Sequence, residues 1–223
     1  MLTTRTKVQL AGIASRGIAG VRRVLGLRNE ATVKRGDIWW KLDLQEGIDL
    51  AIFLFGVFER RTLLACRRHL RTGDIAIDVG ANIGSHTLPL ARYVGSNGRV
   101  FAFEPTAFAH RKLLENVALN PLLAARITVE QIMLVDSSER ALAPQLYSSW
   151  PLATTAPVHA KHLGRLMDTE GARAVSLDEY LESARVQSVA LIKVDVDGHE
   201  CSVLRGALGA IARFPPVIFM EIA

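Results

Sequence analysis

Residues 191–207 of the chain, LIKVDVDGHECSVLRGA, place two aspartates, a histidine and a glutamate within six consecutive positions. Carboxylates held this close together repel one another, so a metal ion, a substrate proton or the start of a helix must compensate for their charge. The acids follow an apolar, β-branched stretch that predicts a buried strand. The chemistry available to this segment depends on which of these three partners it has.

Asp195 and Asp197 form a D-x-D pattern, which gives the first of three interpretations of the segment. Alternation along a strand places both carboxylates on one face, where their oxygens suit Mg²⁺ or Mn²⁺. A metal-dependent glycosyltransferase holds its sugar diphosphate through such a pair. The pattern also arises by chance, and it does not account for the other motifs of the chain.

Local scaffolding is the second interpretation of the segment. Asp197 and Gly198 favour a turn, and Glu200 then falls in the first turn of a helix, where the helix dipole favours negative charge. Catalysis is the third interpretation: Asp195 can orient a substrate or cofactor, and His199 can take a proton from a hydroxyl group. A helix-start residue that bonds to the backbone is the alternative for His199.

A regular alternation of strands and helices occupies residues 72–223, which we expect to form the core domain. Strands are predicted at 74–80, 98–105, 126–136, 188–198 and 215–222, and helices at 85–95, 106–120, 176–184 and 199–214. This order indicates an α/β fold with a doubly wound, mainly parallel sheet. Acids stand at the predicted strand ends: Asp78, Glu104, Asp136, Asp195 and Glu221. They are expected at one edge of the sheet, where a buried Lys193 needs Asp195 or Glu221 as its partner.

The first predicted strand ends in IDVGANIGSH, with a D-x-G-x-N-x-G pattern formed by Asp78, Gly80, Asn82 and Gly84. Glycines at these positions permit a tight turn and let a ligand approach the backbone. Asp78 can hold the amides of this loop or the ammonium group of a ligand. The dinucleotide fingerprint G-x-G-x-x-G is absent, which argues against NAD.

Glu104 ends the second predicted strand, 20 residues after Gly84. An acid at this strand end can accept both hydroxyls of a ribose, so Glu104 and the glycine turn together favour nucleoside binding. An exposed acid at a helix start is the alternative for Glu104. Asp136, after the third strand, is placed where it can meet an adenine amino group, and a purely structural role explains it nearly as well.

These motifs resemble the FkbM family of S-adenosylmethionine-dependent methyltransferases. The resemblance rests on DVGANIGSHTLPLARYVGSNGRVFAFEP, LLENVALN, SLDEYL and LIKVDVDGHECSVLRGA, with WKLDLQEGID and GVFE upstream, and covers residues 36–223. It implies a class I methyltransferase (Rossmann-like) fold, S-adenosyl-L-methionine as the cofactor, no metal, and O-methylation of a hydroxyl on a sugar, polyketide or similar metabolite. It also implies that residues 78–84 hold the methionine part of the cofactor, Glu104 the ribose and Asp136 the adenine edge.

The chain departs from the family pattern at three points. Asp197 stands where the family usually has glutamate, and His86 stands where an aromatic or small residue is more common. His86 is a second candidate base by position, although a surface position on a helix is the simpler interpretation. The sequence also stops after the fifth strand, so we expect the final antiparallel strand pair to be missing and a homo-oligomer to cover the edge. A cofactor-binding remnant without turnover is the alternative function.

Residues 1–71 form the expected N-terminal extension, which is basic and helical with a short β-arm at 37–45. They hold 14 Lys/Arg against 6 Asp/Glu, whereas residues 72–223 hold 13 against 16. This charge favours a solvated helical face, or a peripheral contact with a membrane or a protein, and without interleaved aromatic residues it does not indicate nucleic acid. No apolar run is long enough to span a bilayer. Two distant cysteines predict no disulfide framework, and therefore a cytoplasmic location.

Overall fold

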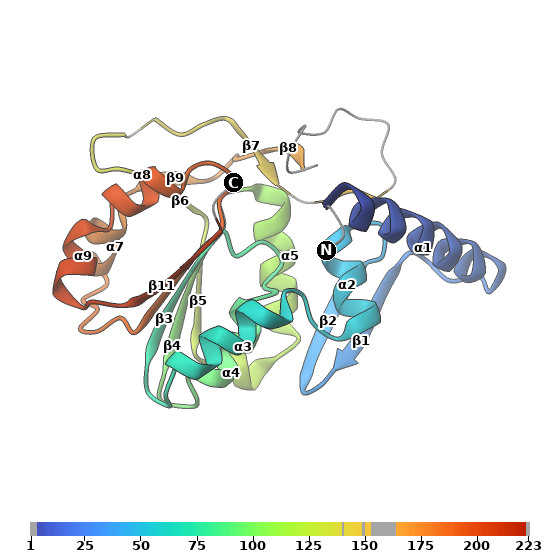
Figure 1. Ribbon diagram of the computed structural model, residues 1–223, viewed down its shortest axis with the longest axis horizontal. Coiled ribbons are helices and arrows are strands. Elements are labelled where there is room, and N and C mark those ends of the chain that lie inside the picture. Colours follow the sequence, from blue (N-terminus) through green and yellow to red (C-terminus); the bar gives the residue numbers. More distant parts are fainter. Residues whose placement is uncertain (1–3, 140, 149, 153–163, 222–223) are drawn as a thin grey trace. The chain divides into compact units, whose positions relative to one another are not determined.

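The computed structural model describes residues 4–139, 141–148, 150–152 and 164–221, with side chains from residue 11 onward. The chain divides into two compact units. The first contains residues 1–58 and 147–166, and the second contains residues 59–146 and 167–223. Figure 1 shows the elements of both units along the chain.

The first unit is built from two helices and a hairpin. Helix α1 (Thr4–Val24) precedes the antiparallel strands β1 (Glu30–Arg35) and β2 (Ile38–Asp43), which are followed by α2 (Gly47–Phe55). Alternate residues of β2 are buried, among them Trp40 and Leu42. Trp150 lies against Gly47, and its ring meets that of Phe58 edge to face with centroids 6.0 Å apart. The hairpin therefore presents one apolar face to a small core of its own.

A five-stranded sheet organises the second unit, in the order β11-β10-β3-β4-β5. Its strands are β3 (Ile75–Val79), β4 (Arg99–Phe103), β5 (Ile127–Glu130), β10 (Leu191–Val194) and β11 (Val217–Met220). Every neighbouring pair in this sheet is parallel. The strand order reverses between β3 and β10, which is the point where doubly wound sheets bind their ligands. The expected α/β fold with a Rossmann-like parallel sheet is therefore confirmed.

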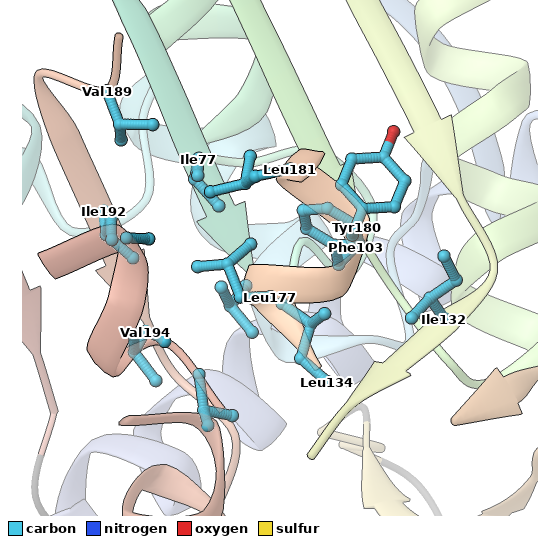
Figure 2. Close-up of a cluster of buried hydrophobic side chains, with 14 of the residues drawn as sticks. Ile77, Phe103, Ile132, Leu134, Leu177, Tyr180, Leu181, Val189, Ile192 and Val194 are labelled. Carbon is cyan, nitrogen blue, oxygen red and sulfur yellow. The ribbon is translucent and has the colours of Figure 1, made fainter. Parts of the chain in front are cut away.

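Helices cover both faces of this sheet. One face packs against α7 (Leu177–Ser183), α8 (Glu200–Arg205) and α9 (Leu208–Arg213), and the cluster in Figure 2 fills the space between. In it the rings of Phe103 and Tyr180 meet edge to face with centroids 4.8 Å apart. The other face packs against α3 (Arg60–His69) and α4 (Thr87–Tyr93) through a second cluster that includes Cys66, Leu90 and Leu191. Burial on both faces explains why these strands are apolar without alternation.

The remaining helices of the second unit are α5 (Ala107–Ala118) and α6 (Pro121–Ala124). Helix α7 begins with the capping box that the sequence SLDEYL contains, because Ser176 and Glu179 each accept a hydrogen bond from the other's backbone amide. Strands β7 (Gln145–Ser148) and β8 (Arg165–Asp168) form a separate two-stranded sheet. No helix in the described part of the chain is both long and apolar enough to cross a membrane.

Two predicted elements are each divided in the structure. The strand predicted at 126–136 breaks at Gln131, where the side-chain amide donates to the Glu170 carbonyl over 2.7 Å. Its second half becomes β6 (Ile132–Leu134), which leaves the main sheet and pairs with β9 (Arg173–Val175). The helix predicted at 199–214 is divided at Gly206, where the backbone packs directly on the Val135 carbonyl and leaves no room for a Cβ. Both breaks coincide with contacts between segments that are far apart in the sequence.

Candidate active site

A buried lysine joins the ends of the two central strands. Lys193 and Asp78 are register partners on β10 and β3, and both side chains are at least 95% buried. The Lys193 ammonium lies 3.4 Å from Asp78 Oδ1 and 3.3 Å from Asp195 Oδ2, and it donates to the Gly80 carbonyl over 3.2 Å. The sequence indicated Asp195 or Glu221 as the partner; the structure pairs Lys193 with Asp195 and adds Asp78.

The two carboxylates decide the charge state of this lysine. Burial alone disfavours the charged ammonium, but the negative charges of Asp195 and Asp78 outweigh it and raise the pKa of Lys193 above its ordinary value. Lys193 is therefore a permanent cation near neutral pH. Asp78 Oδ2 also accepts a hydrogen bond of 2.6 Å from the Thr87 hydroxyl, so each oxygen of Asp78 contacts one group of the protein.

The loop after β3 has the tight turn that its glycines predict. Gly80 has a φ of +75°, and a Cβ there would collide with the Asp195 carbonyl, so this position requires glycine on two counts. The amides of Gly80 and Ala81 both donate to the Phe103 carbonyl at 3.0 Å. The Asn116 side chain, buried on α5, donates to the Ile83 carbonyl at 2.9 Å. The loop is thus fixed from β4, β10 and α5.

Glu104 is buried at the end of β4, so the alternative of an exposed helix-start acid is wrong. Its Oε2 accepts from the Asn82 amide at 2.9 Å, and its Oε1 accepts from both the amide and the hydroxyl of Thr106 at 3.0 and 2.6 Å. Burial raises the pKa of Glu104, while these hydrogen bonds from Thr106 and Asn82 oppose that rise. Four acceptor positions are available on a carboxylate, and these contacts fill three of them.

Asn82 bridges the glycine turn and Glu104. It has a φ of +48°, a left-handed conformation that asparagine tolerates better than most residues. The side-chain oxygen of Asn82 accepts a hydrogen bond from the Ile83 backbone amide at 2.9 Å, while the backbone amide of Asn82 donates to Glu104. Gly84 closes the turn with a φ of +93° and packs against Leu113. Five of the predicted cofactor-binding residues therefore lie within one connected loop and strand end: Asp78, Gly80, Asn82, Gly84 and Glu104.

His86 is buried, so the expectation of a surface position is wrong. Its Nε2 lies 3.4 Å from Glu59 Oε2, and its Nδ1 lies 3.4 Å from the Ser85 hydroxyl. The hydrogen bond from His86 lowers the pKa of Glu59, although partial burial of Glu59 opposes the shift. No local pattern predicts this pair, because the two residues are 27 positions apart and neither belongs to a recognisable motif.

The acidic segment after β10 leaves the strand immediately. Val194 is the last strand residue, and Asp197 and Gly198 form a turn with φ values of +46° and +101°. The D-x-D interpretation required Asp195 and Asp197 to alternate along a strand, and this geometry contradicts it. Glu200 begins α8, where its Oε1 accepts from the Gly198 amide at 3.0 Å, as the scaffolding interpretation predicted.

His199 and Asp195 differ in how firmly they are held. His199 is the residue before α8, partly exposed, and makes no side-chain cap to that helix. The Asp195 side chain is 30% exposed while its Oδ2 contacts Lys193. Asp195 thus presents a partly accessible carboxylate whose orientation is fixed by Lys193. Glu221 has a raised pKa, because of partial burial and then the negative charges of Asp195, Glu59 and Asp197.

Asp136 follows β6 rather than β5, because the predicted third strand is divided. Its Oδ1 accepts from the Ser138 amide at 3.1 Å, a bond that lowers its pKa, and its own amide donates to the Ser202 hydroxyl at 2.9 Å. These contacts connect Asp136 to α8. Within the described contacts, nothing joins it to Glu104 or to the glycine loop, and its predicted role at an adenine edge stays a prediction.

The arrangement combines a rigid glycine turn, a buried carboxylate with one open acceptor position, and a partly exposed carboxylate beside a fixed cation. Such a turn and acid at adjacent parallel strand ends suit the ribose of a nucleoside. A search of the described residues found no group of three or more His, Cys, Asp or Glu side chains that could hold a metal ion.

Comparisons with known proteins agree on one family. The model of the methyltransferase FkbM domain matches residues 78–223. The hexuronic acid methyltransferase AglP of Haloferax volcanii is 31% identical over 141 residues, which cover 62% of this chain and 52% of AglP. This chain therefore spans about half the length of that curated relative.

Solved structures show weaker similarity. The methyltransferase FkbM of Methylobacillus flagellatus is 22% identical with a TM-score of 0.48, over 74% of this chain and 36% of that one. TYW2 of M. jannaschii, solved in complex with AdoMet, is 24% identical with a TM-score of 0.35, over 46% of this chain and 42% of that one. The sequence matches, and not these structural ones, carry the family assignment.

Replacement of Lys193 tests whether the buried cation holds the site together. We expect Lys193→Met to lower the free energy of unfolding by about 3–5 kcal/mol, because it leaves the Asp78 carboxylate buried without a counter-charge. The double variant Lys193→Met/Asp78→Asn removes that charge and should recover part of the loss. Chemical denaturation followed by far-UV circular dichroism measures both.

Lys34→Met provides the matched control for that experiment, since Lys34 is exposed on β1 and its loss should change stability by no more than about 0.5 kcal/mol. A double variant as unstable as Lys193→Met alone would show that the buried carboxylate is not the source of the loss.

Proposed function

Because the chain belongs to the FkbM methyltransferase family, we propose that it transfers the methyl group of S-adenosylmethionine to a hydroxyl oxygen of a sugar or similar metabolite. The observation that supports this most directly is the position and hydrogen bonding of the Glu104 carboxylate. It is buried at the end of β4, is oriented by Asn82 and Thr106, and keeps one acceptor position open. A ribose hydroxyl is the donor that such a position suits.

The residues of the site fit this cofactor. Glu104 receives the ribose, and the turn from Gly80 to Gly84, which is held at the carboxyl ends of β3 and β10, receives the methionine part. When bound, S-adenosylmethionine supplies an electrophilic methyl group on a positively charged sulfur. Asp78 acts as a positioning residue, since it is engaged by Thr87 and Lys193. Asp136 remains our candidate for the adenine edge.

Asp195 and His199 are the proposed catalytic residues. A hydroxyl acceptor must lose its proton as its oxygen is methylated, so a base within reach accelerates the reaction. Lys193 holds one oxygen of the Asp195 carboxylate and leaves the group partly accessible to orient the acceptor. His199 begins the adjacent helix and has the right chemistry to take the proton.

A sugar acceptor is supported by the relative AglP, whose name describes a hexuronic acid methyltransferase. We therefore propose a hydroxyl of a glycan or free sugar as the first acceptor class to examine. A metal-dependent glycosyltransferase is not favoured, since Asp197 lies in a turn and not on the strand.

A cytoplasmic location is proposed from the two thiols. Cys66 and Cys201 are both free, which suits a reducing compartment. Burial raises the pKa of Cys66 to about 11, so that thiol stays protonated and unreactive near neutral pH.

Cofactor binding tests the role of Glu104. We expect Glu104→Gln to weaken S-adenosylmethionine binding by about 10- to 100-fold, because a hydrogen bond from a ribose hydroxyl to a charged acceptor contributes about 1.5–3 kcal/mol. The amide nitrogen of the new glutamine is also a donor, and it would face the donors of Asn82 or Thr106. Isothermal titration calorimetry measures the affinity. Glu182→Gln removes an exposed carboxylate from α7 and should bind as the wild type does. Equal affinity of the wild type and Glu104→Gln would exclude the ribose role.

Substitution of the catalytic candidates tests the transfer step. With radiolabelled S-adenosylmethionine and a panel of hexuronosides as acceptors, we expect Asp195→Asn and His199→Asn each to lower kcat by about 100-fold or more. Both variants should keep the cofactor affinity within about threefold, since the effect is on the orientation of the acceptor and the removal of its proton. Cys201→Ala, an exposed change on the same helix, is the control. Either variant with wild-type kcat removes that residue from the catalytic role.

Chelation tests whether a divalent cation takes part. We expect methyl transfer to the same acceptors to continue at the wild-type rate in excess EDTA, because carboxylates and histidine can orient the acceptor and remove its proton. Activity lost in EDTA and restored by Mg²⁺ would show that the metal interpretation of the acidic segment is correct.

A further inference from the structure

From residue 11 onward, helix α1 contacts the rest of the first unit through the face that carries Ser15 and Arg22. The Ser15 hydroxyl, which is 2% exposed, donates to the Leu44 carbonyl at 2.8 Å. Arg22 lies on the same face and donates to the carbonyls of Arg28 and Glu30 at 2.8 and 3.1 Å. These bonds fix the rotation of the helix about its axis, and so they fix which side chains point outward.

The opposite face of α1 is exposed and apolar. Ile13, Val21 and Val24 are 61%, 61% and 87% exposed, and Leu25, directly after the helix, is 66% exposed. We call these four residues the outer stripe; helical spacing places them along one side. Gly17 and Gly20 lie between them, and a Cβ at either would meet no described atom within 4 Å. Folding of the unit therefore leaves this stripe uncovered by the described residues.

Positive charge surrounds the outer stripe. Arg16 and Arg23 lie two turns apart on one flank and are exposed, and Arg28 follows the helix. Residues 1–29 contain six Lys/Arg and no Asp or Glu. An occupant of this face must accept aliphatic side chains and arginines together, so it must combine an apolar interior with negative charge at its surface.

We propose that the outer stripe of α1 docks on the surface of a lipid bilayer that contains anionic headgroups. The aliphatic side chains enter the boundary between headgroups and acyl chains, and Arg16 and Arg23 stay at the level of the phosphates. The helix lies in the plane of the interface and does not cross it. The attraction to the headgroups weakens with salt, because ions screen exposed charges.

Other occupants fit these observations less well. A second copy of the chain paired stripe to stripe would bring Arg16 and Arg23 of both copies together, at an electrostatic cost. Nucleic acid would satisfy the arginines but would leave Val21 and Val24 exposed to water or to phosphate. A bilayer with anionic headgroups satisfies both kinds of side chain. This inference concerns the first unit and does not rest on the proposed methyl transfer.

Vesicle flotation of the 223-residue chain tests the proposal. Phosphatidylcholine vesicles are compared with vesicles of phosphatidylcholine and phosphatidylglycerol at a ratio of about 7:3, in low and high salt. We expect binding to the anionic vesicles in low salt, little binding to neutral ones, and release in high salt. Arg16→Gln/Arg23→Gln should lower the partition coefficient by about 20- to 30-fold, the product of about fivefold for each arginine.

Two further variants make the test specific. Val21→Ser/Val24→Ser keeps every charge, so it should lower binding only if the apolar side chains enter the bilayer. Arg61→Gln/Arg68→Gln removes the same charge from exposed positions on α3 and should change binding by less than about threefold, since α3 is outside the proposed surface. Circular dichroism shows that each variant is folded.

Three results would overturn the proposal. The first is failure of the wild type to bind anionic vesicles in low salt. The second is an equal loss of binding in the α1 and α3 arginine variants, which would indicate general charge attraction. The third is self-association of the wild type that Val21→Ser/Val24→Ser abolishes without a change in vesicle binding, which would assign the stripe to a second copy.

Discussion

The burial of one ammonium group governs the candidate site. A charged lysine at the centre of a parallel sheet is stable only if carboxylates and a carbonyl surround it, and Lys193 obtains these from Asp78, Asp195 and Gly80. The requirement draws the ends of β3 and β10 together at the point where the strand order reverses. It also orients Asp195 through contacts within the protein alone.

The same network determines the shape of the glycine loop. The Gly80 carbonyl faces Lys193 while its amide binds Phe103, and the Asn82 amide then reaches Glu104. The first of these bonds joins the ends of β10 and β3 and the other two join the ends of β3 and β4, so displacement of one residue would disturb the others. A site constructed in this way is preorganised, because the hydrogen bonds that hold it are formed within the protein and little ordering remains when a ligand binds.

The sequence predicted those features that depend on local pattern. The strand and helix order, the glycine turn and the strand-end acids all follow from periodicity and residue type, and the structure contains them. The features that it did not predict depend on distant contacts. The residues around Gln131 do not predict its hydrogen bond to Glu170, where the chain leaves β4. The residues around Glu59 do not predict its contact with His86. Asp197 was misplaced because the alternation was extended three residues past the true strand end at Val194.

The distribution of tryptophan gives the two units separate optical signals. All three tryptophans, Trp39, Trp40 and Trp150, belong to the first unit, and Trp150 is packed between Gly47 and Phe58. The second unit, which carries the sheet and the candidate site, has none. Indole emission therefore reports the environment of the first unit alone, while the aromatic signals of the second come from tyrosine and phenylalanine. Wild-type protein thus contains an intrinsic fluorophore set that can reveal whether the units melt together or one after the other.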